Sequence, residues 1–234
     1  MVSTEVNNFY VGSSAVDRVY SGSTLVWGLP SSYTRYKCVW STSTSNPPCW
    51  RTLTTYDPSD SGVRICFEPI SGSTRGNIVV WDSARSFWSS EKYAVGFEKT
   101  SDTNLYISKS SKHTVLYDLG SFDEGPYTLE VNYKNSGVVA LYDVDGNLLA
   151  SATYSPPAVT DPKQWYLGNS SGTATTSVYQ QGIKFYYWEI SSGTKTVAKY
   201  VPAHNGSNYV LYDLVHQCTP AIASSTYYNN GTAI

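Results

Sequence analysis

Short strand-like segments separated by turn residues recur along this 234-residue chain, and they constrain its fold more than any other feature. In residues 128–134, Leu129, Val131 and Tyr133 fall on one face and the intervening polar residues on the other. Asp145-Gly146 accepts the positive φ angles of a tight hairpin turn, so it predicts adjacent antiparallel strands over 138–142 and 147–150. Because no amphipathic helix lies between such segments, the pattern predicts a sandwich or barrel rather than a parallel sheet.

The amino-acid composition favours the same class. Tyr (21), Trp (7) and Phe (6) make the chain 15% aromatic, and Met occurs once. Aromatic residues, Val and Thr suit pleated, half-buried surfaces, whereas the best helix formers are sparse. We therefore predict an all-β fold, with further strands at 63–67, 77–81, 93–98, 103–108, 114–118, 164–167, 183–190, 195–200 and 209–212.

The charge balance excludes some partners. Sixteen Lys and Arg oppose eighteen Asp and Glu, giving a net charge of −2. Affinity for nucleic acid comes largely from basic side chains that displace counterions, so no nucleic-acid partner is expected. No apolar stretch approaches the roughly 18 residues that cross a bilayer, and the first twenty residues lack the basic stretch and hydrophobic run of an export signal. We expect a soluble protein without membrane insertion.

The first 28 residues contain a short repeat. Residues 10–16 (YVGSSAV) recur as residues 20–26 (YSGSTLV), and each copy places Gly-Ser between apolar residues, as hairpins do. A lone hairpin is marginal in water, so this unit must lie against something else. We predict an anchoring segment over 1–28, a linker over 29–32 and one domain over 33–234. The expected partner-docking residues are Tyr10, Val11, Val16, Tyr20, Leu25, Val26 and Trp27.

The last fifty residues carry a recognisable order of motifs. The strand at 183–190 is followed by Val201-Pro202-Ala203, Gly206, Leu211-Tyr212-Asp213 and the closing 228–232 (YNNGT). This order resembles the C-terminal part of laminin-G/concanavalin A-like jelly rolls of phage and bacterial surface proteins. The resemblance implies an antiparallel two-sheet jelly-roll sandwich over 33–234. The N-terminal repeat, ending in Val26-Trp27-Gly28, is similar to short segments in structural proteins of tailed bacteriophages.

Together, these resemblances imply a virion component: a fibre, tail or decoration protein assembled in the bacterial cytoplasm. Other virion proteins would bind residues 1–28, and fibre-like relatives imply a homo-oligomer. The alternative is a carbohydrate-binding, lectin-like module of a cell-surface or secreted protein.

Catalytic and metal motifs are missing from the sequence. Glycanases of this architecture resemble one another in an E-x-D-x-E strand that sets two carboxyls across the sugar, and no such segment occurs. Asp143 and Asp145 are interpreted mainly as turn residues, with a weak cation contact as the alternative. The histidines His113, His204 and His216 have no metal or triad spacing. His204 is expected to make a structural hydrogen bond, with a ligand or pH role as the alternative. We predict no enzyme, metal or cofactor.

The four cysteines, Cys38, Cys49, Cys66 and Cys218, form no C-x-x-C pair. Without a secretory signal, buried thiols are favoured over disulfides.

Exposed aromatic residues are the remaining signal for binding, because the apolar face of a sugar stacks on Trp and Tyr. Trp50 with Arg51, and Trp88, lie between polar or turn residues and are candidate contacts for a host glycan. Packing between subunits is the competing interpretation. Trp81, Trp165 and Trp188 fall inside predicted strands and are expected in the core.

Overall fold

The computed structural model describes residues 9–11, 14–16, 18–21, 24–40, 49–57, 60–69, 75–81, 93–99, 103–109, 112–118, 125–132, 137–153, 164–168, 183–219, 221–222 and 230–233. Within these ranges the chain forms strands and turns, and none of them contains a helix suited to crossing a bilayer. The predicted all-β class is confirmed.

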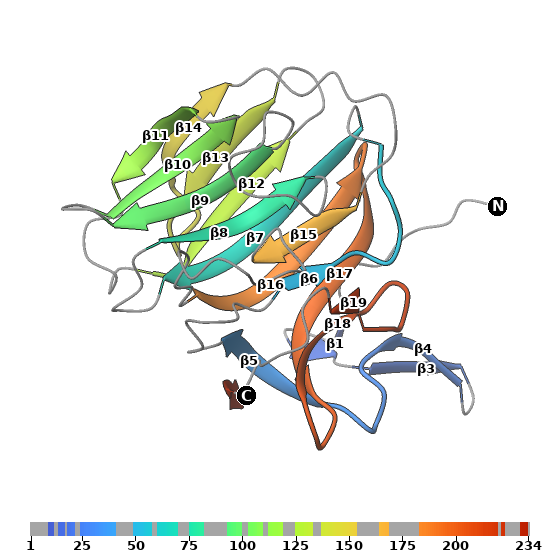
Figure 1. Cartoon of the computed structure of the whole chain (residues 1–234). Helices are drawn as coiled ribbons and strands as arrows, with labels where there is room; N and C mark the ends of the chain where they lie inside the picture. The colour runs from blue at the N-terminus through green and yellow to red at the C-terminus, as the bar shows by residue number, and fades with distance from the viewer. Residues whose placement is uncertain are drawn as a thin grey trace.

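One face of the sandwich is a seven-stranded sheet (Figure 1). Its spatial order is β11 (Lys112–Asp118), β10 (Thr103–Lys109), β9 (Tyr93–Lys99), β8 (Arg75–Trp81), β15 (Trp165–Gly168), β6 (Cys49–Arg51) and β19 (Ala221–Ile222). Every neighbouring pair is antiparallel.

The second sheet has nine strands and lies behind the first in Figure 1. Its order is β14 (Leu148–Thr153), β13 (Val138–Tyr142), β12 (Tyr127–Asn132), β7 (Ser61–Pro69), β16 (Ile183–Ser192), β17 (Lys195–His204), β5 (Thr34–Trp40) and β20 (Asn230–Ala233), with β18 (Tyr209–Asp213) paired to β17. The two antiparallel sheets face each other as a jelly-roll sandwich, as predicted.

Strand β5 lies in a fork, which is the gap between the diverging ends of β16 and β17. These two strands form a hairpin, and Trp188 of β16 lies opposite Tyr200 of β17 where they begin to diverge. Beyond this point, β5 pairs with β16 near Phe185 and with β17 near Ala203. The β5, β17 and β18 strands therefore extend beyond the two-layered part of the molecule (Figure 1).

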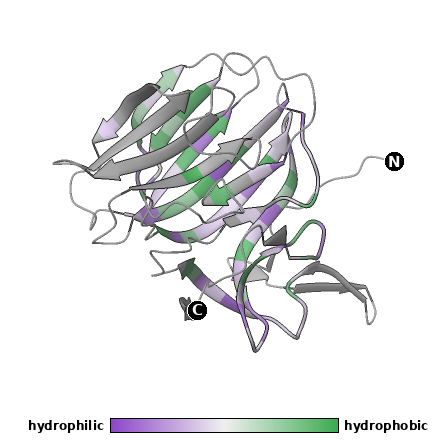
Figure 2. Cartoon of the chain, viewed as in Figure 1, coloured by the Kyte–Doolittle hydropathy of each residue, from purple (hydrophilic) through white to green (hydrophobic). Residues whose placement is uncertain are grey.

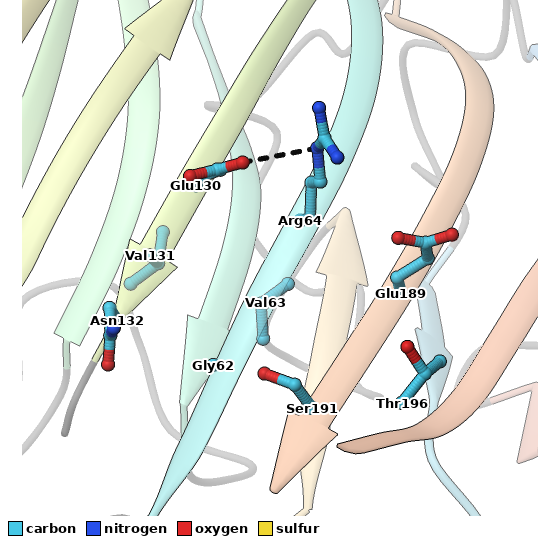
Figure 3. Close-up of a pocket in the computed structure, with 9 residues that line it drawn as sticks. All are labelled: Gly62, Val63, Arg64, Glu130, Val131, Asn132, Glu189, Ser191 and Thr196. Carbon is cyan, nitrogen blue, oxygen red and sulfur yellow. Dashed lines mark ion pairs between the residues drawn. The ribbon is translucent and has the colours of Figure 1, made fainter. Parts of the chain in front are cut away.

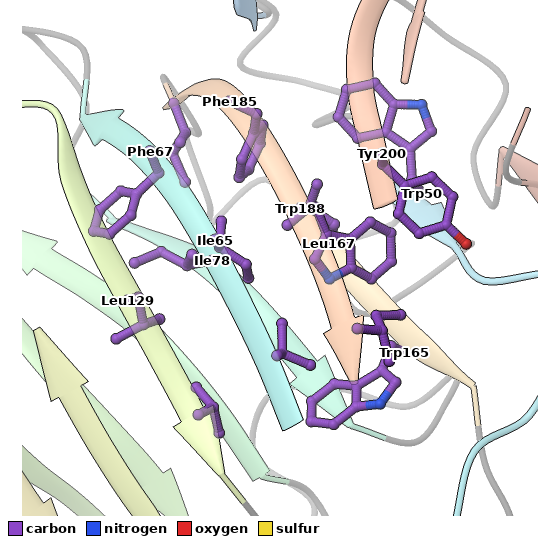
Figure 4. Packing of buried hydrophobic residues seen from close by; sticks show 14 of the residues in the cluster. Trp50, Ile65, Phe67, Ile78, Leu129, Trp165, Leu167, Phe185, Trp188 and Tyr200 are labelled. Carbon is purple, nitrogen blue, oxygen red and sulfur yellow. The ribbon is translucent and has the colours of Figure 1, made fainter. Parts of the chain in front are cut away.

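Apolar and polar residues alternate along the strands, so each sheet has one apolar face (Figure 2). The apolar faces of the two sheets meet and form the core. On β12, Leu129 and Val131 are buried while Asn132 is exposed, which confirms the predicted alternation. Figure 4 shows aromatic and aliphatic side chains of both sheets in contact. Its labelled members are Trp50, Ile78, Trp165 and Leu167 from the seven-stranded sheet and Ile65, Phe67, Leu129, Phe185, Trp188 and Tyr200 from the other.

Each copy of the N-terminal repeat forms its own two-stranded hairpin. Strand β1 (Phe9–Val11) pairs with β2 (Ser14–Val16), and β3 (Arg18–Ser21) pairs with β4 (Thr24–Gly28). Among the described residues, these four strands pair with no strand of either large sheet.

The predicted linker over residues 29–32 is a packed turn. Ser31 and Ser32 are exposed, as expected of a linker, but Leu29 is only 3% exposed. It packs on the side of the β17–β18 ribbon that faces away from the core, and the ring of Tyr33 lies 4.8 Å from that of Tyr212. Leu29 is therefore packed rather than solvent-exposed, because it covers apolar side chains of the ribbon. The residues around it are Val201, Ala203, Val210, Tyr212 and Leu214.

Candidate functional site: a polar hollow on the nine-stranded sheet

The outer face of the nine-stranded sheet, which points away from the core, carries a row of alternating charges. Register places Glu130 of β12 opposite Arg64 of β7, and Arg64 opposite Glu189 of β16. Lys199 of β17 lies opposite Glu189 and completes the row. Cross-strand pairs of opposite charge stabilise a sheet, so the order of signs follows from the register.

A second row of small polar groups lies two residues further along β12, β7 and β16, and three residues further along β17, where the register shifts. It consists of Asn132, Gly62, Ser191 and Thr196, in the order β12, β7, β16 and β17. Because side chains two positions apart share a face, the two rows border one depression.

We call this depression the polar hollow. It has a volume of about 230 Å³ (Figure 3). It is lined by Gly62, Val63, Arg64, Glu130, Val131, Asn132, Glu189, Ser191 and Thr196. The two valines point into the core, so only the polar residues offer side chains to a ligand.

Both carboxylates of the hollow are paired with cations. Arg64 Nε lies 3.2 Å from Glu130 Oε1, and these side chains are 52% and 40% exposed. Lys199 Nζ lies 2.8 Å from Glu189 Oε1 in a less exposed pair. The pairs hold donors and acceptors in fixed positions at the edge of the depression, which a sugar with several hydroxyl groups requires.

The missing side chain of Gly62 opens the floor of the hollow. A Cβ atom built at this position would lie 2.8 Å from Ser191 Oγ and 3.6 Å from the carbonyl oxygen of Val131. The first contact is with a hydroxyl that can rotate away, so a side chain here would fill the hollow without forcing the backbone to move.

Two tyrosines lie on the same outer face. Tyr142 of β13 pairs with Thr128 and is diagonal to Glu130. Partial burial, followed by the nearby Glu130 carboxylate, raises the pKa of Tyr142. The Tyr187 hydroxyl lies 3.5 Å from Thr128 Oγ1, and burial raises its pKa. Tyr142 therefore lies next to Glu130, at the border of the hollow rather than in its lining.

Glu130 and Glu189 are not neighbours in the sheet. One strand separates them, so their backbones lie about 10 Å apart at roughly 4.8 Å per strand. Each carboxylate has a cation within ion-pair distance.

At the other end of the outer face, Glu68 forms a second polar cluster. Its carboxylate accepts hydrogen bonds from Lys184 Nζ and the Tyr186 hydroxyl. Burial, then the hydrogen bond to Glu68, raises the pKa of Tyr186.

A buried carboxylate, Asp213, organises the turn after β18. Its Oδ1 accepts the backbone N–H groups of Lys199, Val215 and His216, and its Oδ2 lies 2.6 Å from His216 Nδ1. Burial, followed by the charge of Asp213, raises the pKa of Tyr200. With the carboxylate 1% exposed and committed to these partners, we assign this cluster to the structure of the turn.

The structure corrects one predicted glycan contact. Trp50 lies in β6, within the seven-stranded sheet, and is 1% exposed. Its ring meets Phe185 edge-on at 6.0 Å in the core, so the expectation of an exposed loop platform is wrong. The preceding Pro47-Pro48 suggested a loop, but strand pairing begins at Cys49.

The remaining predicted glycan contacts are Arg51 and Trp88. Arg51 lies in β6, and Trp88 falls outside the described residues. The predicted docking residues Tyr10, Val11, Val16, Tyr20, Leu25, Val26 and Trp27 all lie in the four strands of the N-terminal hairpins. Trp165 and Trp188 are fully buried as predicted, and Trp81 lies in β8.

Several predictions about turns and thiols are confirmed. Asp143 is a turn residue: its carboxylate accepts the N–H groups of Asp145 and Asn147, and the Asn147 side chain and backbone lower its pKa. His204 accepts the Gly206 N–H at Nδ1. Cys38 and Cys66 are buried, as predicted. The expectation that the chain holds no metal stays a prediction, although within the described ranges no three His, Cys, Asp or Glu side chains gather as metal ligands.

Sequence reasoning missed the polar hollow. The alternation of residues 128–134 placed Glu130 and Asn132 on a wet face, which was the available signal. It did not identify the neighbours of β12, because Arg64 and Glu189 come from strands far away in the sequence.

Comparisons with known proteins add little beyond the fold. No protein-family model matches the chain, and no curated protein sequence matches it. Among solved structures, it is similar to a heptameric SAP-like pentraxin from Limulus polyphemus, with 12% identity, a TM-score of 0.49 and coverage of 79% of this chain and 97% of that chain.

A carbohydrate-binding module from Bacillus subtilis has 12% identity and a TM-score of 0.39, covering 69% of this chain and 96% of the module. Tailspike protein 2 of the Escherichia coli O157:H7 bacteriophage CAB120 has 11% identity and a TM-score of 0.40. That match covers 79% of this chain but only 27% of the tailspike. The strand order and antiparallel pairing described above define the class of fold as an antiparallel two-sheet jelly-roll sandwich.

Proposed function

We propose that this chain is a non-catalytic glycan-binding protein of a tailed-phage particle, held on that particle by its N-terminal hairpins. The polar hollow is the observation that carries the glycan-binding part. Its ion-paired Arg64 and Glu130, with Asn132 and Ser191, offer charged and neutral hydrogen-bonding groups on a rigid sheet. Tyr142 adds an aromatic face beside them, the combination by which proteins bind both faces of a sugar.

The size of the hollow supports a small ligand. Its volume of about 230 Å³ is below the roughly 300–1,000 Å³ of pockets that enclose drug-sized molecules. One sugar residue of a longer chain would enter it, while neighbouring residues would lie along the outer face. The ligand class is therefore a surface polysaccharide recognised residue by residue.

The anchoring part rests on the hairpins β1–β2 and β3–β4. Within the described residues they pair only with each other, and isolated hairpins of this length are marginal in water. A partner that covers them would supply the missing stabilisation. The resemblance of the repeat to segments of phage structural proteins makes a virion protein the proposed partner.

An array of bacterial surface polysaccharides tests glycan binding. Wild type should bind at least one polysaccharide, and Gly62→Ala should weaken binding at least tenfold because its methyl group occupies the hollow. Ser151→Ala, an exposed change on β14 of the same sheet, is the matched control and should bind as wild type does. No binding by wild type, or equal binding by Gly62→Ala, would reject the hollow as a glycan site.

Deletion of residues 2–28 tests the anchor. The shortened chain keeps Leu29 and its cover over the β17–β18 ribbon, so it should fold and bind glycan normally. It should fail to enter particles when it replaces the full chain in the producing host. Normal incorporation would reject the anchoring role and leave glycan binding untouched.

A further inference from the structure

Three aromatic rings meet where the β5, β17 and β18 strands extend beyond the two-layered sandwich. Tyr36 of β5, His204 at the end of β17 and Tyr209 at the start of β18 form this aromatic cluster. Ring centroids lie 4.5 Å apart for His204 and Tyr209, 5.2 Å for Tyr36 and Tyr209, and 5.9 Å for Tyr36 and His204. All three residues are half-buried, so part of each remains accessible.

The cluster lies on the side of the sheet opposite to the polar hollow. His204 is directly opposite Tyr209, and Pro202 is opposite Leu211, which is buried in the main core. Because residues two apart share a face, His204 and Tyr209 continue the core-facing side of the sheet. A single sugar cannot contact both this cluster and the hollow, since the sheet itself separates them.

Hydrogen bonds fix the orientation of the cluster and of the loop beside it. The Gly206 N–H donates to His204 Nδ1 at 3.2 Å, which leaves Nε2 as the donor of a neutral imidazole. Asn205 Oδ1 accepts the N–H groups of Ser207 and Asn208 and so fixes the turn of the loop. All four residues of the loop, 205–208, are exposed.

We propose that the aromatic cluster and this loop form a second carbohydrate subsite, which binds the terminal residue of a glycan. The inference rests on the proposed glycan-binding function and deepens it. Tyr36 and Tyr209 meet at an interplanar angle of 85°, so they make a corner rather than a flat platform. One ring of a corner can stack on the apolar face of a sugar while the other blocks continuation of the chain, which selects an end over an internal residue.

The loop supplies the polar half of the subsite. The Asn205 amide and the Ser207 hydroxyl are exposed groups beside the rings, and sugar hydroxyls need such donors and acceptors. With the hollow on the opposite face, the protein would hold two glycan chains at once. Two weak sites on one molecule raise the avidity for a dense polysaccharide surface without any additional contact.

Backbone amide NMR of the full chain tests this subsite. The methyl glycosides of glucose, galactose, mannose, rhamnose and N-acetylglucosamine serve as probes, because each presents a terminal sugar. At least one should shift the amides of Gly206 and Ser207, which report on the His204 hydrogen bond and the loop. Tyr209→Ala should weaken that response about tenfold by loss of stacking.

His204→Phe provides a second variant that retains a ring but removes both nitrogens. It should also weaken the response at Gly206, whereas Gly62→Ala should leave the loop response unchanged. Shifts at Asn132 and Ser191 without any at 206–208 would overturn the second subsite and leave the hollow intact. Absence of shifts at both places, with no binding on the polysaccharide array, would overturn the proposed function and this inference together.

Discussion

Replacement of Leu29 by alanine should destabilise the sandwich, although the residue lies in a stretch that reads as a linker. Leu29 is 3% exposed and covers the outward side of the β17–β18 ribbon. Leu→Ala changes at buried sites cost about 2.7–5.0 kcal/mol, increasing with the cavity left behind. Because half-buried Tyr33 can move into part of the space, we expect about 3 kcal/mol.

Chemical denaturation followed by tryptophan fluorescence measures this loss directly. At roughly 2–4 °C per kcal/mol for a chain of this size, the melting temperature should fall by about 6–12 °C. Leu53→Ala is the matched control, because it is the same change at a side chain that is 52% exposed, and it should cost less than about 1 kcal/mol. Equal losses for the two variants would show that Leu29 is not packed, and the account of residues 29–33 would be wrong.

Three further changes follow from the described contacts. Asp213→Ala should lower the free energy of unfolding by several kcal/mol in denaturation, because each buried N–H left unpaired costs about 1–3 kcal/mol. His216→Ala, at the exposed partner, should cost less than about 1 kcal/mol. Equal effects would refute the assignment of Asp213 to the structure of the turn. Burial raises the pKa of Cys66 to about 11, so at pH 8 its alkylation, followed by peptide mass spectrometry, should be roughly 100-fold slower than that of an ordinary thiol. Stability should also fall as pH rises from about 9 through 11, because the unfolded thiol ionises first. Gly146→Ala should cost about 1 kcal/mol through its φ of +85° alone, since nothing lies within 4 Å of the added methyl, and no loss would contradict that origin.

The local sequence pattern predicted many of the strands, because the burial of alternate residues and the closure of a tight turn depend on residues within the segment itself. The alternation in β12 follows from the burial of Leu129 and Val131, and the β13–β14 hairpin follows from Gly146, whose positive φ closes the turn. Strand β5 was not predicted. Its pairing with both arms of the β16–β17 fork depends on contacts across more than 140 residues, which no local pattern records.

The candidate site shows the same division. The prolines that precede Trp50 predict a loop, but the pairing of its strand with β15 and β19 places Trp50 in the core. The hollow combines residues of β12, β7, β16 and β17, so it exists only once the register of these four strands is set. A site whose residues are neighbours across strands therefore cannot be predicted from the spacing of motifs in the sequence.

Strand β17 relates the proposed anchor to the proposed ligand site. Thr196 borders the hollow, while Val201 and Ala203 of the same strand lie under Leu29. At about 3.3 Å per residue, five to seven positions separate the two places by roughly 16–23 Å. A partner bound to the hairpins that precede Leu29 would meet the sandwich at the far end of this strand and would leave the hollow open. Anchoring and glycan binding are thus compatible in one molecule, and a partner that blocked binding on the array would have to reach across the whole length of β17.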